Sequence, residues 1–340
     1  MHTRTLQLSL ACVALLGLLG SDALQAAGLG SPPATQRRSA AQRHRQKPSA
    51  APLPCGDYLG FQVLLDKQGF SPGQIDGRPG KNFAHALAAF QTARHLAATP
   101  QPDCETWRAL GGDATETLTT YTIRQQDVDG PFEPNIPRNI VDQAKLQALS
   151  YKSPMELLGE RFHASPALLQ RLNPGTSLTA GQQIRVPAVT PFDPDAKPAA
   201  DPANADVEIQ VTGADSSLRA TRADGTVVLF APVTTGSEHD PLPAGDYKVT
   251  VVNWHPTFHY NPDLFWDAKS TDEKATIKPG PNNPVGVLWI SLSLEHYGLH
   301  GTPEPGNIGH TESHGCVRLT NWDAARLATL VKPGTRVLFR

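Results

Sequence analysis

The stretch Ser313-His314-Gly315-Cys316-Val317-Arg318-Leu319 decides how the rest of the chain is interpreted, because Cys316 is the only cysteine without a candidate partner. Cys12 lies inside a predicted export signal, while Cys55 and Cys104 bracket one small segment and could close it as a disulfide. Unpaired thiols tend to be oxidised in exported proteins. A lone cysteine is often a small buried hydrophobe, but the export context and the flanking His-Gly favour a catalytic nucleophile.

Residues 1–26 are predicted to be a cleaved signal peptide. A basic start precedes Leu6–Gly20, a mostly apolar run without charge, and small residues offer cleavage after Ala23 or near Ala26. The run is short for a membrane span, which makes an uncleaved anchor the weaker alternative. Lipid attachment at Cys12 is rejected because the apolar run continues past it. The mature chain is therefore expected outside the cytoplasm.

Length and composition indicate several modules rather than one core. The chain has 340 residues, 31 of them proline, and a formal net charge of −2. Two stretches, the basic Pro/Ala-rich 27–54 and the Pro-rich 190–205, contain too few apolar residues to offset their ordering entropy and are predicted linkers. The sequence has no basic patch interleaved with aromatic residues, so nucleic-acid binding is not expected.

Residues 55–112 contain three helical patterns around the turn-rich stretch Ser71–Gly80. The segment resembles the peptidoglycan-binding type 1 domain, a three-helix module with the pattern Gly-Tyr/Phe-x-Pro-Gly-x-x-Asp-Gly and a later Phe-Gln. The resemblance implies wall binding for the module. The individual residues Asp76-Gly77 and Phe90-Gln91 are expected to build a turn and a core.

Residues 118–189 end in Leu168–Pro187, an apolar helix followed by Asn-Pro, a Gly turn and a short alternating strand. This resembles a LysM domain, a βααβ fold that binds N-acetylglucosamine-containing glycan strands. The opening strand would be Tyr121-Thr122-Ile123 and the first helix Met155–Phe162. Asp127–Ser150 is interpreted as an insertion, and the usual Gly-Asp-Thr-Leu is absent, so glycan binding and scaffolding stay equally open.

Residues 206–340 show short β-branched strands separated by Gly, Pro and Asp turns, typical of a mainly-β domain. One helix is expected at Asn321–Val331 with Asn321 as its cap, and a last strand at Arg336–Phe339. The predicted fold class is multidomain α+β: a three-helix module, a βααβ module, and a mainly-β, β-sandwich-like domain with one helix after Cys316. A fragment beginning near Asp206 is expected to keep the chemistry.

His300-Gly301-Thr302 precedes Cys316 by sixteen positions, counted from His300. Acyl transfer by a thiol needs a base, a group that orients the base, and donors for the developing oxyanion. We expect His300 to take the Cys316 proton and the Gly301 carbonyl to hold the other ring nitrogen. The amides of Gly315 and Cys316 are candidate oxyanion donors. Papain-like hydrolases are excluded, since they place the cysteine before the histidine and no histidine follows Cys316.

Zinc is the alternative for this region, because histidine and thiolate are good zinc ligands. The candidates are His296, His300, His310, His314 and Cys316. No pair has finger or zincin spacing, and the loop lies between strands. We therefore expect no metal and no cofactor, with His296 and His310 at the surface or near the site.

The third segment also resembles the L,D-transpeptidase catalytic domain of the YkuD family, whose motif is His-Gly-Thr, about a dozen residues, then Ser/Thr-His-Gly-Cys. Gly280–Gly286, Pro241–Tyr247 and Asp323–Val337 match it too. The resemblance implies that Cys316 and His300 are catalytic. It further implies contributions to the oxyanion loop or to substrate binding from His314, Ser313, Arg318 and Tyr260. Packing is the alternative for Tyr260, which lies in a candidate lid, Phe258–Trp266.

The resemblance implies a cysteine acyltransferase acting on peptidoglycan tetrapeptide stems and acylated by carbapenem β-lactams. The acceptor amine would belong to another stem, giving a 3→3 cross-link, or to a lysine of an envelope lipoprotein. Arg318 places the chain in a branch that includes proteobacterial periplasmic enzymes, so a periplasmic location is expected. An L,D-carboxypeptidase, a hydrolase that detaches wall-bound protein, and a non-catalytic wall-binding scaffold stay open as alternatives.

Overall fold

The computed structural model describes residues 52–202, 206–313 and 315–340. The predicted signal peptide, nearly all of the basic linker and His314 lie outside the described residues. The chain from Ser49 to Arg340 forms one compact unit. Within the described ranges, no helix is both long and apolar enough to cross a membrane.

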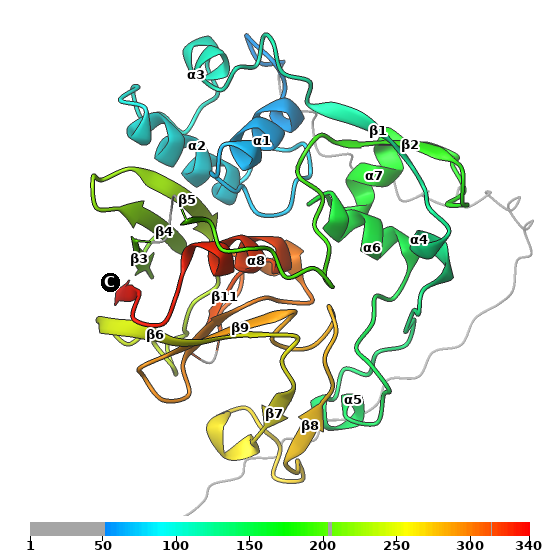
Figure 1. Cartoon of the computed structure of the whole chain (residues 1–340), viewed down its shortest axis with the longest axis vertical. Coiled ribbons are helices and arrows are strands. Elements are labelled where there is room, and N and C mark those ends of the chain that lie inside the picture. The colour runs from blue at the N-terminus through cyan, green and yellow to red at the C-terminus, as the bar shows by residue number, and fades with distance from the viewer. Residues whose placement is uncertain (1–51, 203–205, 314) are drawn as a thin grey trace, which may run out of the picture. The chain divides into compact units, whose positions relative to one another are not determined.

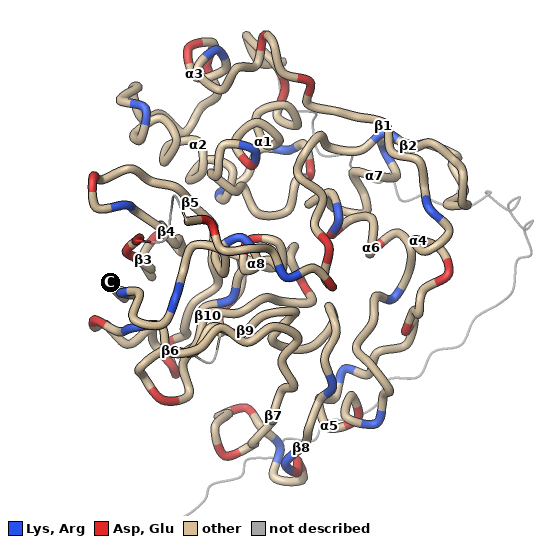
Figure 2. The backbone as a smooth tube through the Cα atoms, viewed as in Figure 1, with Lys and Arg blue, Asp and Glu red and all other residues tan. Residues whose placement is uncertain are grey.

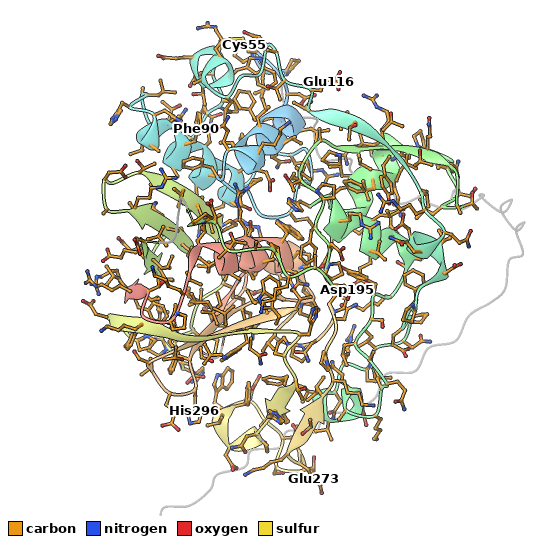
Figure 3. All side chains as sticks on the ribbon, in the orientation of Figure 1. Cys55, Phe90, Glu116, Asp195, Glu273 and His296 are labelled. Carbon is orange, nitrogen blue, oxygen red and sulfur yellow. A yellow bond between two sulfur atoms is a disulfide. The ribbon has the colours of Figure 1, made fainter. Side chains whose placement is uncertain are left out.

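The first module consists of three helices (Figure 1): α1 Tyr58–Lys67, α2 Lys81–Ala93 and α3 Cys104–Ala109. The side chains of Asp57 and Asp103 cap α1 and α3, each accepting a backbone N–H at 2.7 Å. A disulfide joins Cys55, labelled in Figure 3, to Cys104. Closing a loop of this length stabilises a fold by about 4 kcal/mol in the chain-entropy model.

The dipeptides Asp76-Gly77 and Phe90-Gln91, which belong to the peptidoglycan-binding pattern, have structural roles in this module. Gln62 receives the amides of Asp76 and Gly77 on its Oε1 at 3.1 and 2.7 Å and donates to the Asp76 carboxylate. Gly77 has φ +70°, which favours glycine. Phe90 and Gln91 are both fully buried. The sequence prediction of a turn and a core is therefore confirmed for these residues.

The second module has the predicted strand–helix–helix–strand order, with two short helices in the predicted insertion. In chain order its elements are β1 Leu118–Thr122, α4 Gln126–Asp129, α5 Ile140–Gln143, α6 Pro154–Arg161, α7 Pro166–Leu172 and β2 Gln183–Pro187. β1 and β2 pair antiparallel, from Leu118 opposite Pro187 to Thr122 opposite Gln183. Ser153 and Ser165 cap α6 and α7, each followed by proline at the first helical position. The LysM assignment stays a prediction.

The third module is built on eight hydrogen-bonded strands in the order β11-β10-β9-β6-β12-β3-β4-β5. Its strands are β3 Val207–Thr212, β4 Ser217–Arg222, β5 Val227–Pro232, β6 Gly245–Trp254, β7 Phe258–Tyr260, β8 Ala275–Ile277, β9 Leu288–Leu292, β10 Gly298–His300, β11 Val317–Arg318 and β12 Arg336–Phe339. The helical elements are η2 Pro262–Leu264, η3 Pro305–Asn307 and α8 Asn321–Leu330. β7 and β8 form a separate two-stranded ribbon.

The long strand β6 makes this sheet resemble a sandwich. Its first half pairs with β12 and its second half with β9, and the register shifts between Val249 and Val251. Such a shift bends a strand so that it belongs to two layers. A bridge between Thr234 and Arg318 then brings the chain after β5 back to β11. The predicted mainly-β class is confirmed, with both layers parts of one curled sheet.

Helix α8 packs its apolar face on this sheet, and Ala324 and Leu327 belong to the same core as Ile290 and Leu299. Thr320 caps the helix by accepting the Asp323 amide at 3.1 Å. The prediction of Asn321 as the cap is wrong by one residue. The side chain of Asn321 is thereby available for other contacts.

The three modules are not independent of one another. Phe230 of β5 exchanges backbone hydrogen bonds of 2.8 Å with Gly69 and Ser71 of the first module, and its buried ring belongs to that module's core. In the second module, the ring of His163 stacks on Trp322 of α8, with centroids 5.0 Å apart and planes at 7°.

The predicted linker 190–205 also contributes to the core. Phe192 is 7% exposed within the apolar cluster of the third module, and its amide donates to the Arg161 carbonyl at 2.8 Å. Composition alone missed this contact because a single aromatic residue carries it.

Figure 2 shows that acidic and basic residues are interspersed over all three modules, in agreement with the small net charge.

That a fragment beginning near Asp206 keeps the chemistry stays a prediction, but this packing indicates that such a fragment is less stable. Such a fragment would expose Phe230 and Trp322, and burying one large apolar side chain contributes about 1.5–3 kcal/mol. We expect the fragment to unfold at a lower temperature than residues 49–340, measured by circular dichroism. In the longer protein, Phe230→Ala should cost about 3–5 kcal/mol, whereas the control Val251→Ala, at a position 54% exposed, should cost little. Equal melting of fragment and longer protein would contradict the packing argument.

Candidate active site

Two paired strands bring the segments that contain His300 and Cys316 next to each other. In the parallel β10–β11 ladder, His300 lies opposite Arg318, and in the antiparallel β9–β10 ladder it lies opposite Trp289. Paired residues project to the same face, and side chains two apart on a strand share a face. Arg318 therefore projects to the same face as His300, and Cys316 lies in the bend directly before β11, next to the strand that pairs with His300. Gly298, the residue two before His300, adds no side chain there.

The tautomer of His300 follows from its contacts. Nδ1 lies 2.7 Å from the carbonyl oxygen of Gly301, and a carbonyl only accepts, so Nδ1 carries the proton. The lone pair of Nε2 is then available as a base. The ring is 3% exposed and stacks on Trp289 with centroids 5.3 Å apart. The expected role of Gly301 as the orienting carbonyl agrees with this geometry.

Burial and the nearby Arg318 guanidinium lower the pKa of His300 to about 3, against the opposing hydrogen bond to Gly301. For Cys316, burial raises the pKa of the thiol, while the backbone of Gly298 and the charge of Arg318 lower it. The Sγ–H donates to the carbonyl of His296 at 3.6 Å. The resting pair is thus a neutral thiol and a neutral imidazole rather than an ion pair.

Glycine is required directly before the nucleophile. Gly315 has φ +98°, and a Cβ atom there would lie 2.7 Å from Cε1 of Tyr297. Ser313 supports the same loop: it is 4% exposed, its Oγ donates to the Cys316 carbonyl at 2.7 Å, and its amide donates to Thr235. This placement favours a loop-bracing role for Ser313 over the predicted substrate contact.

Arg318 places a partly buried cation near enough to Cys316 for their charges to interact. Burial lowers the pKa of its guanidinium, while Cys316, Glu304 and Asp267 raise it through their charges. Asp267 follows Trp266, whose ring stacks on His239 with centroids 4.3 Å apart. The segment between β7 and β8 therefore reaches the electrostatic surroundings of the site, and Arg318 is placed to meet an anionic group.

The side chain of Tyr260 packs in the protein interior. It is 6% exposed in an apolar cluster with Leu149 and Ile277, and its hydroxyl donates to Asp272 at 3.3 Å. This favours the packing alternative over the predicted substrate contact. Leu149 comes from the insertion in the second module, so that insertion packs against the β7–β8 ribbon.

Two of the other histidines that were candidate zinc ligands are exposed. His296, labelled in Figure 3, is an exposed side chain 3.5 Å from Glu295, and His310 is exposed as well. The predicted roles of His314 concern a residue outside those described. Among the described residues, no three His, Cys, Asp or Glu side chains form a group that could hold a metal ion.

Sequence reasoning missed three residues of the site. Trp289 carries the His300 ring, Tyr297 covers Gly315, and Asn321 packs against Gly301. The alternating pattern of the strand at Val285–Leu294 could have placed Trp289 beside His300 only if the strand pairing had been known. Asn321 was noticed, but as a helix cap.

Comparison with known proteins identifies related domains in two parts of the chain. Residues 206–338 match the family model of the YkuD L,D-transpeptidase catalytic domain, and residues 60–110 match that of a peptidoglycan-binding domain. A Bacillus licheniformis protein named as the L,D-transpeptidase YkuD is 30% identical over 186 residues, which are 54% of this chain and 91% of that protein. Its Bacillus subtilis counterpart is 31% identical over 178 residues, 52% of this chain and 87% of that protein.

Both matches are longer than the third module, so they include part of the module before it. Among solved structures, an L,D-transpeptidase from Xylanimonas cellulosilytica aligns over 86% of this chain and 100% of that chain, at 17% identity and a TM-score of 0.36. Because the match to the Bacillus licheniformis protein covers nearly its entire length, the chain belongs to the YkuD family of L,D-transpeptidases.

Proposed function

We propose that the protein cleaves peptidoglycan tetrapeptide stems by forming a thioester at Cys316. The observation that carries this proposal is the pairing of β10 with β11, which sets His300 beside the strand that directly follows Cys316, while the Gly301 carbonyl leaves Nε2 as the base. The match to a peptidoglycan-binding domain at residues 60–110 agrees with a wall substrate.

The reaction balances with these groups alone. Nε2 of His300 accepts the thiol proton as sulfur attacks the carbonyl of the third stem residue, and the proton then passes to the amine of the departing D-Ala. Because burial disfavours both the thiolate and the imidazolium, proton transfer accompanies attack rather than preceding it. The amides of Gly315 and Cys316 receive the oxyanion, and Arg318 attracts a carboxylate of the stem.

The second half-reaction needs an amine. His300 takes its proton as the amine attacks the thioester, and the C–S bond breaks to restore the thiol. A stem-peptide amine gives a 3→3 cross-link, a lysine of an envelope lipoprotein anchors that protein, and water gives a carboxypeptidase. Mass spectrometry of products from disaccharide-tetrapeptides distinguishes dimer formation from loss of D-Ala.

The proposed location is the periplasm, after cleavage of residues 1–26. The Cys55–Cys104 disulfide is supporting evidence, because such bonds persist in oxidising compartments.

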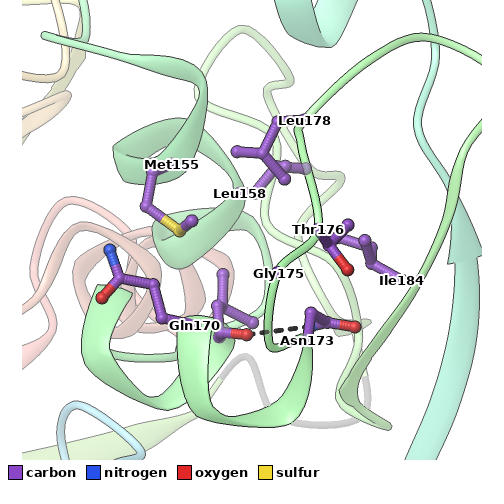
Figure 4. Close-up of a pocket in the computed structure, with 9 residues that line it drawn as sticks. Met155, Leu158, Gln170, Asn173, Gly175, Thr176, Leu178 and Ile184 are labelled. Carbon is purple, nitrogen blue, oxygen red and sulfur yellow. Dashed lines mark hydrogen bonds between the residues drawn. The ribbon is translucent and has the colours of Figure 1, made fainter.

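The second module offers a candidate glycan contact. A pocket of about 120 Å³ lies between α6, α7 and the loop before β2 (Figure 4), and its lining includes Met155, Gln170, Asn173, Thr176 and Leu178. Its apolar floor with polar groups at the edge suits a sugar ring. We propose that this pocket contributes to wall binding.

Replacing the nucleophile tests the function. Cys316→Ala should abolish carbapenem adducts and all turnover of tetrapeptide while leaving the melting temperature near that of the parent, because only a sulfur is lost. Intact-mass spectrometry and product analysis measure both. The parental protein serves as the positive control. Tetrapeptide turnover at the parental rate in Cys316→Ala would disprove the thioester mechanism and leave the scaffold alternative or another nucleophile.

The base assignment predicts an unusual pH profile. His300→Ala should slow acylation by about 10²–10⁴-fold. In the parent, a pKa of about 3 keeps His300 neutral between pH 5 and pH 7, so the acylation rate should stay level as pH falls from 7 to 5. Stopped-flow measurement of carbapenem acylation gives this profile. An acidic limb with a midpoint near 6.5 that disappears in His300→Ala would show that the histidine titrates normally and contradict the buried neutral base.

Filling the pocket of the second module tests wall binding without touching the catalytic site. Thr176→Trp should reduce co-sedimentation of the protein with insoluble sacculi and leave carbapenem acylation unchanged. Asp224→Ala, in the exposed β4–β5 turn of the third module, is the matched control. Equal sedimentation of parent and Thr176→Trp would remove the pocket from the wall-binding surface.

A further inference from the structure

The side chain of Asn321 links the catalytic loop to the second module. Asn321 is fully buried at the start of α8, and its Oδ1 accepts the Val287 amide at 3.2 Å. Its Nδ2 lies 3.1 and 3.2 Å from the two carboxyl oxygens of Glu160, on α6, and 3.1 Å from the carbonyl of Pro281. Both ends of this amide are therefore engaged, one within the catalytic module and one toward its neighbour.

The side-chain amide of Asn321 also packs against the backbone of Gly301. A Cβ atom at Gly301 would lie 2.2 Å from Asn321 Oδ1, and one at Gly286 would lie 2.1 Å from it, so two backbone segments pack directly against one oxygen. The Gly301 amide donates to the Leu288 carbonyl at 3.2 Å, and the Gly301 carbonyl accepts from Nδ1 of His300. The carbonyl that selects the basic nitrogen of His300 thus depends on where Asn321 is held.

Glu160 holds Asn321 from the other side. The Glu160 side chain is 6% exposed and also accepts from the Tyr151 hydroxyl at 3.0 Å. Burial raises the pKa of Glu160 to about 8, with Glu156 acting in the same direction and the bonds from Asn321 and Tyr151 opposing. Burial also raises the pKa of Tyr151 well above its ordinary value, so this hydroxyl remains a donor throughout. Ionisation of Glu160 strengthens the hydrogen bonds that it accepts.

We propose that Glu160 is a positioning residue for the catalytic base: acting through Asn321, it fixes the Gly301 carbonyl that keeps His300 protonated on Nδ1. The inference rests on the proposed role of His300 as the base. Because Glu160 belongs to α6, the chemistry at Cys316 depends on the second module being docked, in addition to any binding of wall by that module.

Three variants of the chain from Ser49 to Arg340 test the proposal through carbapenem acylation. Glu160→Ala should lower the maximal acylation rate by about 10- to 100-fold, as expected for a slightly misplaced group, with the half-saturating concentration little changed. Glu160→Gln keeps an acceptor for Asn321 and should restore most of the rate. His163→Ala disturbs the stack on Trp322 at the same interface without touching Asn321, and should keep the parental rate.

A purely structural role for Glu160 predicts another pattern. It would lower the rates of Glu160→Ala and His163→Ala in proportion to their losses of melting temperature. That result, or a parental rate in folded Glu160→Ala, overturns the proposal.

A spectroscopic readout remains informative even if Glu160→Ala folds poorly. In ¹⁵N-histidine-labelled Cys316→Ala, which lacks the thiol, the ring nitrogens of His300 should show the Nδ1–H tautomer and a shift with a midpoint near pH 8. The signals are assigned by their loss in the His300→Gln variant. The midpoint should vanish in Cys316→Ala/Glu160→Gln. Its persistence there, or its absence from Cys316→Ala, overturns the proposal.

The outcomes separate this inference from the proposed function. If Cys316→Ala still turns over substrate, or His300→Ala acylates at the parental rate, the assigned mechanism is wrong and the positioning role is overturned with it. If both variants fail as expected while Glu160→Ala acylates normally, only the positioning role is wrong.

Discussion

The parallel pairing of β10 with β11 is the constraint on which the site depends. It sets His300 opposite Arg318 and brings the segment that carries Cys316 beside β10. Two parallel strands need a crossover connection, and here the connection between His300 and Val317 contains η3 and the loop that ends in Gly315. A shift of this register by one residue would pair His300 with a residue other than Arg318 and turn the Arg318 side chain to the opposite face. The Thr234–Arg318 bridge, with hydrogen bonds of 2.9 and 3.0 Å, holds the outer side of β11.

The second constraint is electrostatic. Burial opposes charge on both His300 and Cys316, and Arg318 acts on the two in different ways, since its charge disfavours an imidazolium but favours a thiolate. A resting thiol is less reactive toward oxidants than a thiolate, which agrees with the proposed periplasmic location. Activation then coincides with substrate attack, when the proton has a destination and the oxyanion has donors.

The sequence alone was enough to predict the features that follow from a local pattern. The His-Gly-Thr and Ser-His-Gly-Cys motifs located Cys316 and His300, and strand alternation predicted the mainly-β class. A local pattern does not decide roles that depend on tertiary packing. Ser313 and Tyr260 turn inward to brace a loop and a ribbon, and no periodicity distinguishes a bracing hydroxyl from one that meets substrate. Module independence was inferred from composition, but single residues such as Phe192 and Phe230 carry the packing.

Asn321 shows why such packing matters for chemistry. A helix-capping residue and an interior amide have the same appearance in sequence, and the structure separates them because Thr320 takes the cap. The side-chain amide of Asn321 donates to the Glu160 carboxyl group of the second module. It also packs against Gly301 of the catalytic module, whose carbonyl orients His300. Burying Glu160 without a cation is costly, so its position in α6 has to be offset by the bonds from Tyr151 and Asn321. The bond from Asn321 forms only when the second module is docked, so docking of that module and the geometry of His300 are linked. An accessory module that only tethered the enzyme to the wall would not need such a contact.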